Sequence, residues 1–458
     1  MTRVAGRPPR IVAIADTDSY VKWAAALLGA EGGRVDAALL VLETPLVVSD
    51  SQLASALVGS ALARDRVERI AHAALAARLA QLRPDAVLLG ARGPLVRVLA
   101  REIADLQPRP VLVTGLPGIS IPATRKAVVY RLQCDLFVVH SQREVREFGA
   151  LSARTGYAHR YALATLPFAR GASGVAGAAA AGSRPGGTDL VFATQAKVPA
   201  EREDRLRIAR LLRAAAEADP SRRVVVKLRA AAGEHQTHVE QDGYPELLAS
   251  LGPLPPNLVT STAPMARALA SAEGLVTVSS TAAIEAIASG VPVIALDMFG
   301  VSASLINETL ADADLLAGEE DVVARRFRHP DPEWLDENYF HAPAADDWTD
   351  ALDSLIALRA AGALPQRAPF ARRGGALRDA WERRIALGRS DTSASGAIAY
   401  AVGMPARTAV RLANRARRAL RKGADAGTGA VASATAGLPE EAGDLVRGEA
   451  DRRLRAGR

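Results

Sequence analysis

The sequence LVTVSSTAAIEAIASGVPVIAL, residues 275–296, contains the pattern that decides the fold. Its first four residues are apolar or β-branched and predict a buried strand, and Ser279, Ser280 and Thr281 follow at the carboxyl end of that strand. The run AAIEAIAS then predicts a helix that ends at Gly290, and VPVIAL predicts the next strand. A strand, a polar turn, a helix and a second strand in this order indicate a parallel sheet with helices on its faces.

Short aliphatic runs and longer helical stretches alternate in the same way along most of the chain. Strands are expected at residues 11–15, 36–42, 86–89, 111–114 and 136–139, and again at 190–193, 223–228, 258–259, 275–278 and 291–296. Helices are expected at residues 20–28, 53–83, 95–105, 203–218, 265–271 and 282–289. The pattern predicts an α/β fold with two Rossmann-like domains that face a central cleft, where ligands bind outside the carboxyl ends of the strands.

A Gly- and Ala-rich segment, GASGVAGAAAAGSRPGG at residues 171–187, separates the two groups of strands and has the composition of a flexible linker. We therefore predict four regions: an N-terminal domain at 1–170, a linker at 171–188, a second domain at 189–355, and an Arg-rich helical extension with a disordered tail at 356–458. Within the extension, RTAVRLANRARRALRK at residues 407–422 predicts a basic helix. This helix either stays in solvent or contacts anionic membrane lipid.

The composition narrows the classes of protein to which the chain belongs. Aromatic residues make up 4% of the 458 residues, so we expect no nucleic-acid partner that depends on base stacking. The net charge is +7, but much of the arginine excess lies in the C-terminal extension and says little about an active site. Cys134 is the only cysteine, which excludes an intrachain disulfide and fits a reducing cytoplasm. No apolar run is long enough for a signal peptide or a membrane span, so a cytoplasmic protein is expected, with peripheral contact to the inner face of the cell membrane as an alternative.

Three consecutive hydroxyl groups at a predicted helix start are suited to binding phosphate. The backbone N–H groups of a first helical turn and the positive end of the helix dipole attract anions, and Ser279, Ser280 and Thr281 add small donors. Glu285 lies in the first turns of the same helix and could accept hydrogen bonds from a ribose. The alternative is an ordinary helix cap, for which Ser and Thr are preferred residues.

The segment SSTAAIEAIASGVPVIAL resembles the donor-domain motif of GT-B glycosyltransferases, above all that of bacterial capsule-type enzymes: polysialyltransferases, Kdo transferases and CDP-glycerol glycerophosphotransferases. In that group a Ser-Ser pair at this helix start binds the donor phosphate, which implies the same role for Ser279 and Ser280. Nucleotide-sugar 2-epimerases share the arrangement. LVFATQ at residues 190–195 is similar to the first donor-domain strand, and CDLFVVHSQRE at 134–144 to the last acceptor-domain strand. The Ala- and Arg-rich composition resembles an actinobacterial-type branch of these enzymes.

The sequence departs from the capsule-type pattern after VVVKLR at residues 224–229. Those enzymes carry a Lys-x-His-Pro motif at this place, whereas this chain continues with GEHQTH at residues 233–238. The resemblance implies that four basic residues contact the donor: Lys227, Arg229, His235 and His238. Solvated basic side chains are the alternative, and a metal site is not expected because the two histidines lack a third ligand.

Asp16 and Asp18, in the sequence DTDS after the first predicted strand, are candidates for the general base. An inverting transfer needs a base that deprotonates the acceptor hydroxyl, and the resemblance to GT-B enzymes implies that this strand end faces the cleft. Turn and cap chemistry is the alternative for both residues. DTD also matches the Asp-x-Asp metal motif of other glycosyltransferases, but that motif normally lies far from the N-terminus. We therefore expect neither a metal nor another cofactor.

Together these residues predict a glycosyltransferase that moves a sugar from a nucleotide-sugar donor, CMP- or CDP-linked in preference, to a cell-surface polysaccharide or glycolipid acceptor. A nucleotide-sugar 2-epimerase of the same fold and an inert binding or scaffold protein stay open as alternatives. Further candidates are residues for an anionic acceptor, Arg125, Lys126 and Arg131, and residues near the sugar, Asp297, Asn307 and Glu308.

Overall fold

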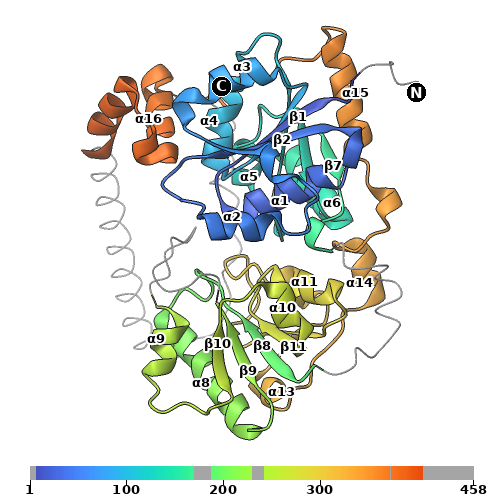
Figure 1. Cartoon of the computed structure of the whole chain (residues 1–458), viewed down its shortest axis with the longest axis vertical. Helices are drawn as coiled ribbons and strands as arrows, with labels where there is room; N and C mark the ends of the chain where they lie inside the picture. Colours follow the sequence, from blue (N-terminus) through green and yellow to red (C-terminus); the bar gives the residue numbers. More distant parts are fainter. Residues whose placement is uncertain (1–6, 170–186, 229–241, 372, 406–458) are drawn as a thin grey trace, which may run out of the picture. The chain divides into compact units, whose positions relative to one another are not determined.

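A computed structural model of the chain describes residues 7–169, 187–228, 242–371 and 373–405 (Figure 1). One compact unit extends as far as Gly396, and a second begins at Ala397, of which residues 397–405 are described and are helical. Within the described ranges, no helix is long and apolar enough to cross a membrane.

The first compact unit contains two parallel sheets, and the first of them has seven strands in the order β3-β2-β1-β4-β5-β6-β7. Its strands are β1 (Arg10–Ala15), β2 (Asp36–Leu42), β3 (Val67–Ile70), β4 (Ala86–Gly90), β5 (Val111–Gly115), β6 (Leu136–Val139) and β7 (Tyr161–Leu163). The helices between them are α1 (Asp18–Gly29), α2 (Asp50–Leu57), α3 (His72–Leu82), α4 (Gly93–Ala104), α5 (Arg125–Val129) and α6 (Gln142–Thr155).

The second sheet has six parallel strands in the order β10-β9-β8-β11-β12-β13. Its strands are β8 (Asp189–Ala193), β9 (Val224–Lys227), β10 (Leu258–Ser261), β11 (Ala272–Thr277), β12 (Val293–Leu296) and β13 (Leu316–Ala317). The helices that accompany this sheet are α8 (Arg202–Ala218), α9 (Tyr244–Ala249), α10 (Met265–Ala270), α11 (Ala282–Ala288), α12 (Glu308–Ala311), α13 (Glu319–Val323) and α14 (Pro332–Glu337).

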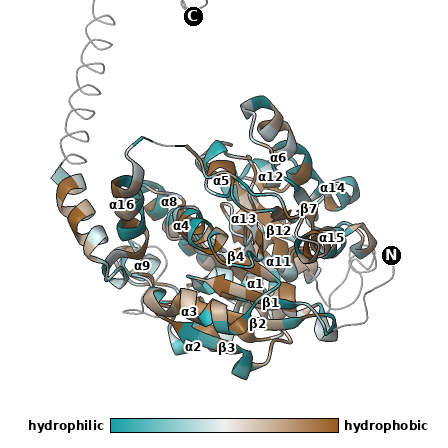
Figure 2. Ribbon diagram, turned by 90° about the horizontal axis from the view of Figure 1, so that it is seen from above, coloured by the Kyte–Doolittle hydropathy of each residue, from teal (hydrophilic) through white to brown (hydrophobic). Residues whose placement is uncertain are grey.

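The central strands are apolar because helices cover both faces of each sheet. Along β1, Ile11 and Ala13 belong to one hydrophobic core, and Val12 and Ile14 belong to the core on the opposite face. This alternation follows from the two-residue period of a strand. Figure 2 shows the apolar colour on β4, whose five residues are all buried.

The C-terminal part of the described chain returns to the first sheet (Figure 1). Helix α15 (Trp348–Ala360) packs Trp348, Leu352 and Leu355 into the core that contains β1, and α16 (Gly375–Leu387) buries Leu387 in the core on the other face. The predicted domain boundary between residues 355 and 356 therefore lies inside α15. Residues 170–186 of the predicted linker and residues 406–458 of the predicted tail lie outside the described residues.

The strand order reverses at one place in each sheet, between β1 and β4 in the first and between β8 and β11 in the second. At such a switch point the connecting helices leave to opposite faces, and open α/β sheets generally bind ligands outside the carboxyl ends of the two strands. The fold class predicted from the sequence, α/β with two Rossmann-like parallel-sheet domains, is confirmed.

One prediction of local structure is wrong, and two further strands were missed. Residues 53–83 are not one helix, because they contain α2, the edge strand β3 and α3. The chain turns sharply at Gly59 and Ala61, which have φ angles of 74° and 58°. The sequence pattern also failed to indicate β7 and β13, which have three and two residues. Such short strands contain too few residues to show a strand period.

Candidate functional site

Two loops meet at the switch point of the second sheet, one after β8 and one after β11. Gln195 bridges them, because its Nε2 donates to the Ser279 Oγ at 3.1 Å and its Oε1 accepts from the Ser279 backbone N–H at 2.9 Å. Arg205 of α8 fixes the first loop by donating to the carbonyl oxygens of Gln195 and Pro199. The bridge holds the buried Ser279 at the switch point of the second sheet, where open α/β sheets generally bind their ligands.

The three predicted hydroxyl residues follow β11, and most backbone N–H groups around them already have hydrogen-bond partners. The Ser280 N–H donates to Thr277 Oγ1 at 3.1 Å, and the Ala282 N–H donates to Ser280 Oγ at 3.2 Å. The Ala283 N–H donates to the Ser280 carbonyl, so few backbone donors of the first turn remain for a ligand. In these bonds the Ser279 and Ser280 hydroxyls act as acceptors, and their protons stay available. A phosphate here would therefore be bound chiefly by hydroxyl groups.

Lys227 is the last residue of β9, and its side chain is buried where a surface cation would be exposed. Its buried ammonium donates to the carbonyl of Leu228, and its own carbonyl accepts from the N–H and hydroxyl of Thr194 at 3.2 and 3.0 Å. Lys227 therefore stabilises the loop after β8. The three other predicted basic contacts, Arg229, His235 and His238, lie outside the described residues. In the part of the chain that is described, no group of three or more His, Cys, Asp or Glu side chains could hold a metal ion.

Glu285 is engaged in a contact between elements of the two sheets. Its Oε1 lies 3.1 Å from the Nζ of Lys22 in α1, so the carboxylate predicted to meet a ribose already has a cationic partner. Thr281, four residues before Glu285, also contacts the first domain. A Cβ atom built on Gly118 would lie 2.7 Å from the Thr281 hydroxyl oxygen. The loop after β5 therefore touches the loop after β11, which brings the carboxyl ends of the two sheets into contact at this point.

Asp16 and Asp18 have different surroundings at the switch point of the first sheet. Asp16 is 0% exposed, and its Oδ2 and Oδ1 accept from the Nε and the backbone N–H of Arg92 at 2.6 and 3.3 Å. Burial raises the pKa of the Asp16 carboxyl above its usual range, although the charge and hydrogen bonds of Arg92 oppose the rise. Asp18 is half-buried at the first position of α1. Asp18 is thus the more accessible of the two carboxylates.

A buried polar network lies at the end of β6. The Trp23 indole N–H donates to His140 Nε2 at 2.7 Å, and His140 Nδ1 lies 2.7 Å from the Ala164 carbonyl, so the imidazole carries its proton on Nδ1. Burial lowers the pKa of His140 to about 4, and the ring is neutral. Glu144 is also buried, and its carboxylate accepts hydrogen bonds from Ser120, the His140 N–H and the Tyr339 hydroxyl. This network fixes the loop after β5, β6 and the segment after α14 to one another.

The remaining predicted residues differ in their surroundings. Asn307 is buried, and its amide bonds the backbone of Gly300 and Ser302, which shapes the loop after β12. Asp297 is exposed at the end of β12, and Glu308 is the first residue of α12. Exposed Arg125 donates to the Tyr157 hydroxyl, and Lys126 follows it in α5. Arg131 is almost fully buried next to β5.

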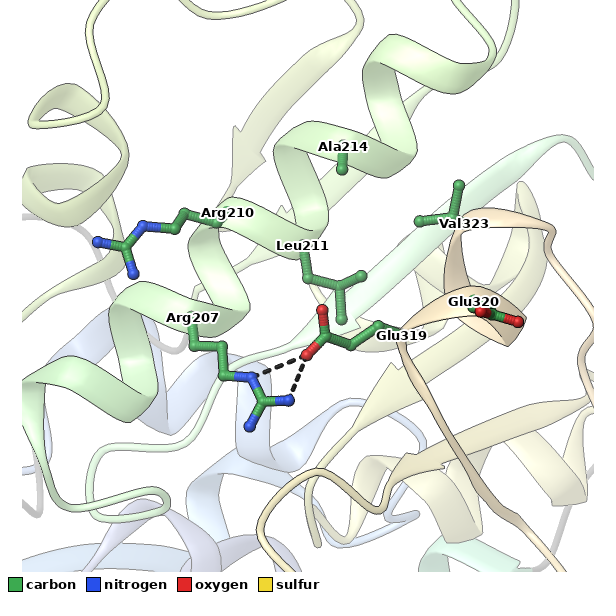
Figure 3. Close-up of a pocket in the computed structure, with 7 residues that line it drawn as sticks. All are labelled: Arg207, Arg210, Leu211, Ala214, Glu319, Glu320 and Val323. Carbon is green, nitrogen blue, oxygen red and sulfur yellow. Dashed lines mark hydrogen bonds and ion pairs between the residues drawn. The ribbon is translucent and has the colours of Figure 1, made fainter.

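A groove of about 510 Å³ lies on another part of the second domain, between α8 and α13 (Figure 3). An apolar floor is flanked by charged residues, including the ion pair between Arg207 and Glu319, whose Nε and Oε1 lie 2.8 Å apart. The lining residues are Arg207, Arg210, Leu211, Ala214, Glu319, Glu320 and Val323. None of the residues at the two switch points lines this groove, so it is a separate surface feature.

Residues 11–355, which include both sheets, match the model of a family described as "Putative glycosyltransferase (DUF6716)". The chain belongs to this family. No curated protein matches its sequence.

Solved structures similar to this chain include an S. aureus MnaA–UDP complex, with 11% identity and a TM-score of 0.48 over 79% of this chain and 100% of that chain. A UDP-glucosyltransferase from Polygonum tinctorium has 14% identity and a TM-score of 0.45, over 78% and 100% of the two chains. The UDP-GlcNAc 2-epimerase from Methanocaldococcus jannaschii has 11% identity and a TM-score of 0.46, over 76% and 99%. At these values the likenesses give no information on the substrate or reaction of the chain.

Sequence reasoning missed several side chains that organise the strand ends of the two sheets. Gln195 and Arg92 each lie two residues after a strand at a switch point, and a polar residue soon after a buried strand was the available signal. His140 and Glu144 lie in the segment CDLFVVHSQRE, but their partners Trp23 and Tyr339 are far away in the sequence. No local pattern could have indicated those partners.

Proposed function

We propose that the chain transfers a sugar from a nucleotide-sugar donor to an acceptor hydroxyl, with the donor phosphates bound by Ser279, Ser280 and Thr281. The observation that supports this proposal is the bridge from Gln195 to Ser279 at the switch point of the second sheet, where hydroxyl protons stay available. Open α/β sheets bind their ligands at this position. Membership of a family described as glycosyltransferases supports sugar transfer in place of another reaction.

In this proposal Asp18 is the general base and Asp16 a positioning residue. A base must reach the acceptor hydroxyl within hydrogen-bonding distance, and the half-buried Asp18 is accessible whereas Asp16 is enclosed and bound to Arg92. Asp18→Asn should abolish transfer and leave nucleotide binding unchanged. Measuring both quantities on the same preparation checks this, and full transfer activity in the variant would exclude Asp18 as the base.

The proposal extends to the partners of the reaction. We propose a CMP- or CDP-linked donor, a cell-surface polysaccharide or glycolipid acceptor, and a reaction in the cytoplasm that needs no metal ion. The basic sequence at residues 407–422 would bring the protein to the inner face of the membrane by attraction to anionic lipid. Activity that persists in EDTA would support the metal-free reaction, and activity lost in EDTA and restored by a divalent cation would overturn it.

Thermal denaturation with CMP, CDP, UDP and GDP tests the proposed donor site. A ligand that binds only the folded state stabilises it by about 2.7 kcal/mol at 100 times its Kd, which raises the Tm measurably. We expect at least one nucleotide to do so. If none of the four raises the Tm at millimolar concentration, the chain is better explained as a binding or scaffold protein that retains the fold.

A second incubation separates transfer from epimerisation. With UDP-N-acetylglucosamine and no acceptor, a transferase should leave the configuration of the sugar at C2 unchanged, whereas a 2-epimerase should invert it. NMR of the sugar protons distinguishes the two products. Rapid inversion would replace the transferase proposal with the epimerase.

A further inference from the structure

At the switch point of the first sheet, two guanidinium groups lie with the carboxylate of Asp16, and the half-buried Asp18 lies two residues farther along the chain. Arg92 follows β4, Arg131 lies beside the end of β5, and Asp16 follows β1. The hydroxyl of the buried Tyr20 lies among them. It accepts a hydrogen bond from Arg131 Nη2 at 3.3 Å, and the charges of Asp16 and Arg92 act on its pKa. These residues form one cluster, which we call the arginine cluster.

Asp16 engages only part of the Arg92 guanidinium group. Asp16 accepts from the Nε of Arg92 at 2.6 Å, while the Nη2 is buried and has no hydrogen-bond partner. The side chain is 35% exposed, so it borders solvent on one side and Asp16 on the other. A guanidinium offers five donors in a planar fork that matches a carboxylate or phosphate. Part of that fork remains without a partner in this protein.

Arg131 is a buried cation surrounded by neutral groups. It is 2% exposed, and it donates to Thr114 Oγ1 at 3.3 Å, to the Tyr20 hydroxyl at 3.3 Å and to three backbone carbonyls at 3.2 to 3.5 Å. Among the described residues, no carboxylate lies within ion-pairing distance of it. Two of the carbonyls belong to Ala91 and Gly115, at the ends of β4 and β5.

Counted over Arg92, Arg131 and Asp16, the arginine cluster carries one positive charge in excess. Asp16 balances one of the two guanidinium groups, and the other lacks a counter-charge within ion-pairing distance in the described part of the chain. Tyr20 and the nearby His140 do not change this sum, because both are neutral at physiological pH. An unbalanced buried charge is costly, and an anionic ligand group at the cluster would offset that cost.

We propose that the switch point between β1 and β4 binds an anionic group, a carboxylate or a phosphate, carried by the acceptor. Arg92 contacts the anion directly, and Arg131 contributes its charge from below the strand ends. That this anion belongs to the acceptor rests on the proposed function, since the acceptor must lie across from the donor phosphates held by the second sheet. The acceptor class is thereby narrowed to acidic or phosphorylated saccharides.

Isothermal titration with glucose 6-phosphate, glucuronate and glucose tests this inference. The wild-type protein should bind both anionic sugars about tenfold or more tightly than glucose. Arg92→Gln should remove the preference, and Arg92→Lys should keep part of it because the charge remains while the fork is lost. Asp16→Asn combined with Arg92→Gln removes both members of the pair, so a folded protein without the preference remains testable. Arg154→Gln is the matched control, since Arg154 is exposed in the last turn of α6, a helix that packs against the edge strand β7.

Equal binding of the three sugars, no binding of the anionic sugars at millimolar concentration, or a preference that survives Arg92→Gln would each overturn the inference. The titrations are repeated with saturating nucleotide to separate the acceptor from the donor. Anion binding that persists beside the nucleotide supports an acceptor site, and competition between them would reassign the arginine cluster to the donor. If nucleotide binds but anionic sugars do not, only this inference fails. If anionic sugars bind at Arg92 and no nucleotide binds, the proposed transfer fails instead.

Discussion

Gln195 offers the sharpest single-residue perturbation of the proposed donor site. Its Oε1 accepts from the Ser279 N–H at 2.9 Å, and its Nε2 donates to the Ser279 hydroxyl at 3.1 Å. Gln195→Glu keeps the shape of the side chain and the first of these bonds. The Ser279 hydroxyl can reverse its role and donate to the new carboxylate oxygen, so the bridge survives. The substitution therefore adds a negative charge beside the proposed phosphate position and also engages the Ser279 hydroxyl proton, and both changes weaken phosphate binding.

The magnitude of the effect follows from the charge. At a separation of about 6 Å and an effective dielectric constant of about 20, the new carboxylate and one phosphate charge repel each other by about 3 kcal/mol. Since about 1.4 kcal/mol changes Kd tenfold, nucleotide binding should weaken roughly 100-fold. The Tm without ligand should stay close to that of the wild type, because the bridging hydrogen bonds are retained.

Isothermal titration of the nucleotide that stabilises the wild-type protein measures this change, with Gln81→Glu as the matched control. Gln81 is exposed in α3 and receives the same change of charge far from the second sheet. The control should bind nucleotide as the wild type does. If Gln195→Glu also binds with wild-type Kd, the donor phosphate does not lie beside Ser279 and the reasoning is refuted.

Two further predictions concern buried contacts of Glu144 and Gly115 in the first domain. Burial raises the pKa of the Glu144 carboxyl, and a carboxyl with a raised folded pKa makes folding less favourable as the pH rises through that pKa. Tyr339→Phe removes one hydrogen-bond donor to the ionised Glu144 carboxylate and raises its pKa further. Chemical denaturation should therefore show that the free energy of unfolding falls by about 1–2 kcal/mol near neutral pH, and by less at a pH below the usual pKa range of a glutamate. A fall that does not depend on pH would contradict the role given to Glu144. Gly115→Ala would place a Cβ atom 2.4 Å from Cζ2 of the buried Trp23 and should cost about 1–3 kcal/mol. Gly149→Ala is its control, since a Cβ atom there meets nothing within 4 Å, and equal Tm values for the two variants would show that Trp23 can move aside.

The sequence allowed the α/β fold to be predicted because the central strands, such as β1 and β12, are continuous aliphatic runs that no other structure explains well. The edge strand β3 was hidden, since Val67 and Ile70 are spaced as they would be on a helix. The return of α15 to the first sheet could not be predicted either. Trp348 of α15 is buried by tertiary contacts with the core around β1 to β7, whose residues lie far earlier in the chain.

The candidate site was predictable only where its signal is local. Polar residues after buried strands indicated Ser279 and Asp16. Their electrostatic partners were not predictable, because the pairs join distant positions: Arg92 lies 76 residues from Asp16, and Lys22 lies 263 residues from Glu285. These partners decide whether a carboxylate can act as a base or bind a ribose. Sequence patterns thus located the strand ends, and the structure was needed to assign the carboxylates found there.

Titration of the wild-type protein and of the Ser279→Ala, Ser280→Ala double variant with the stabilising nucleotide tests the central claim most directly. Both substitutions remove hydroxyl donors after β11 while circular dichroism and the Tm without ligand report whether the fold is kept. The account predicts that the wild type binds the nucleotide and that the double variant binds it at least about tenfold more weakly, since each hydrogen bond to a charged phosphate is worth about 1.5–3 kcal/mol. The same Kd for both proteins would contradict the claim that the end of β11 binds the donor phosphate.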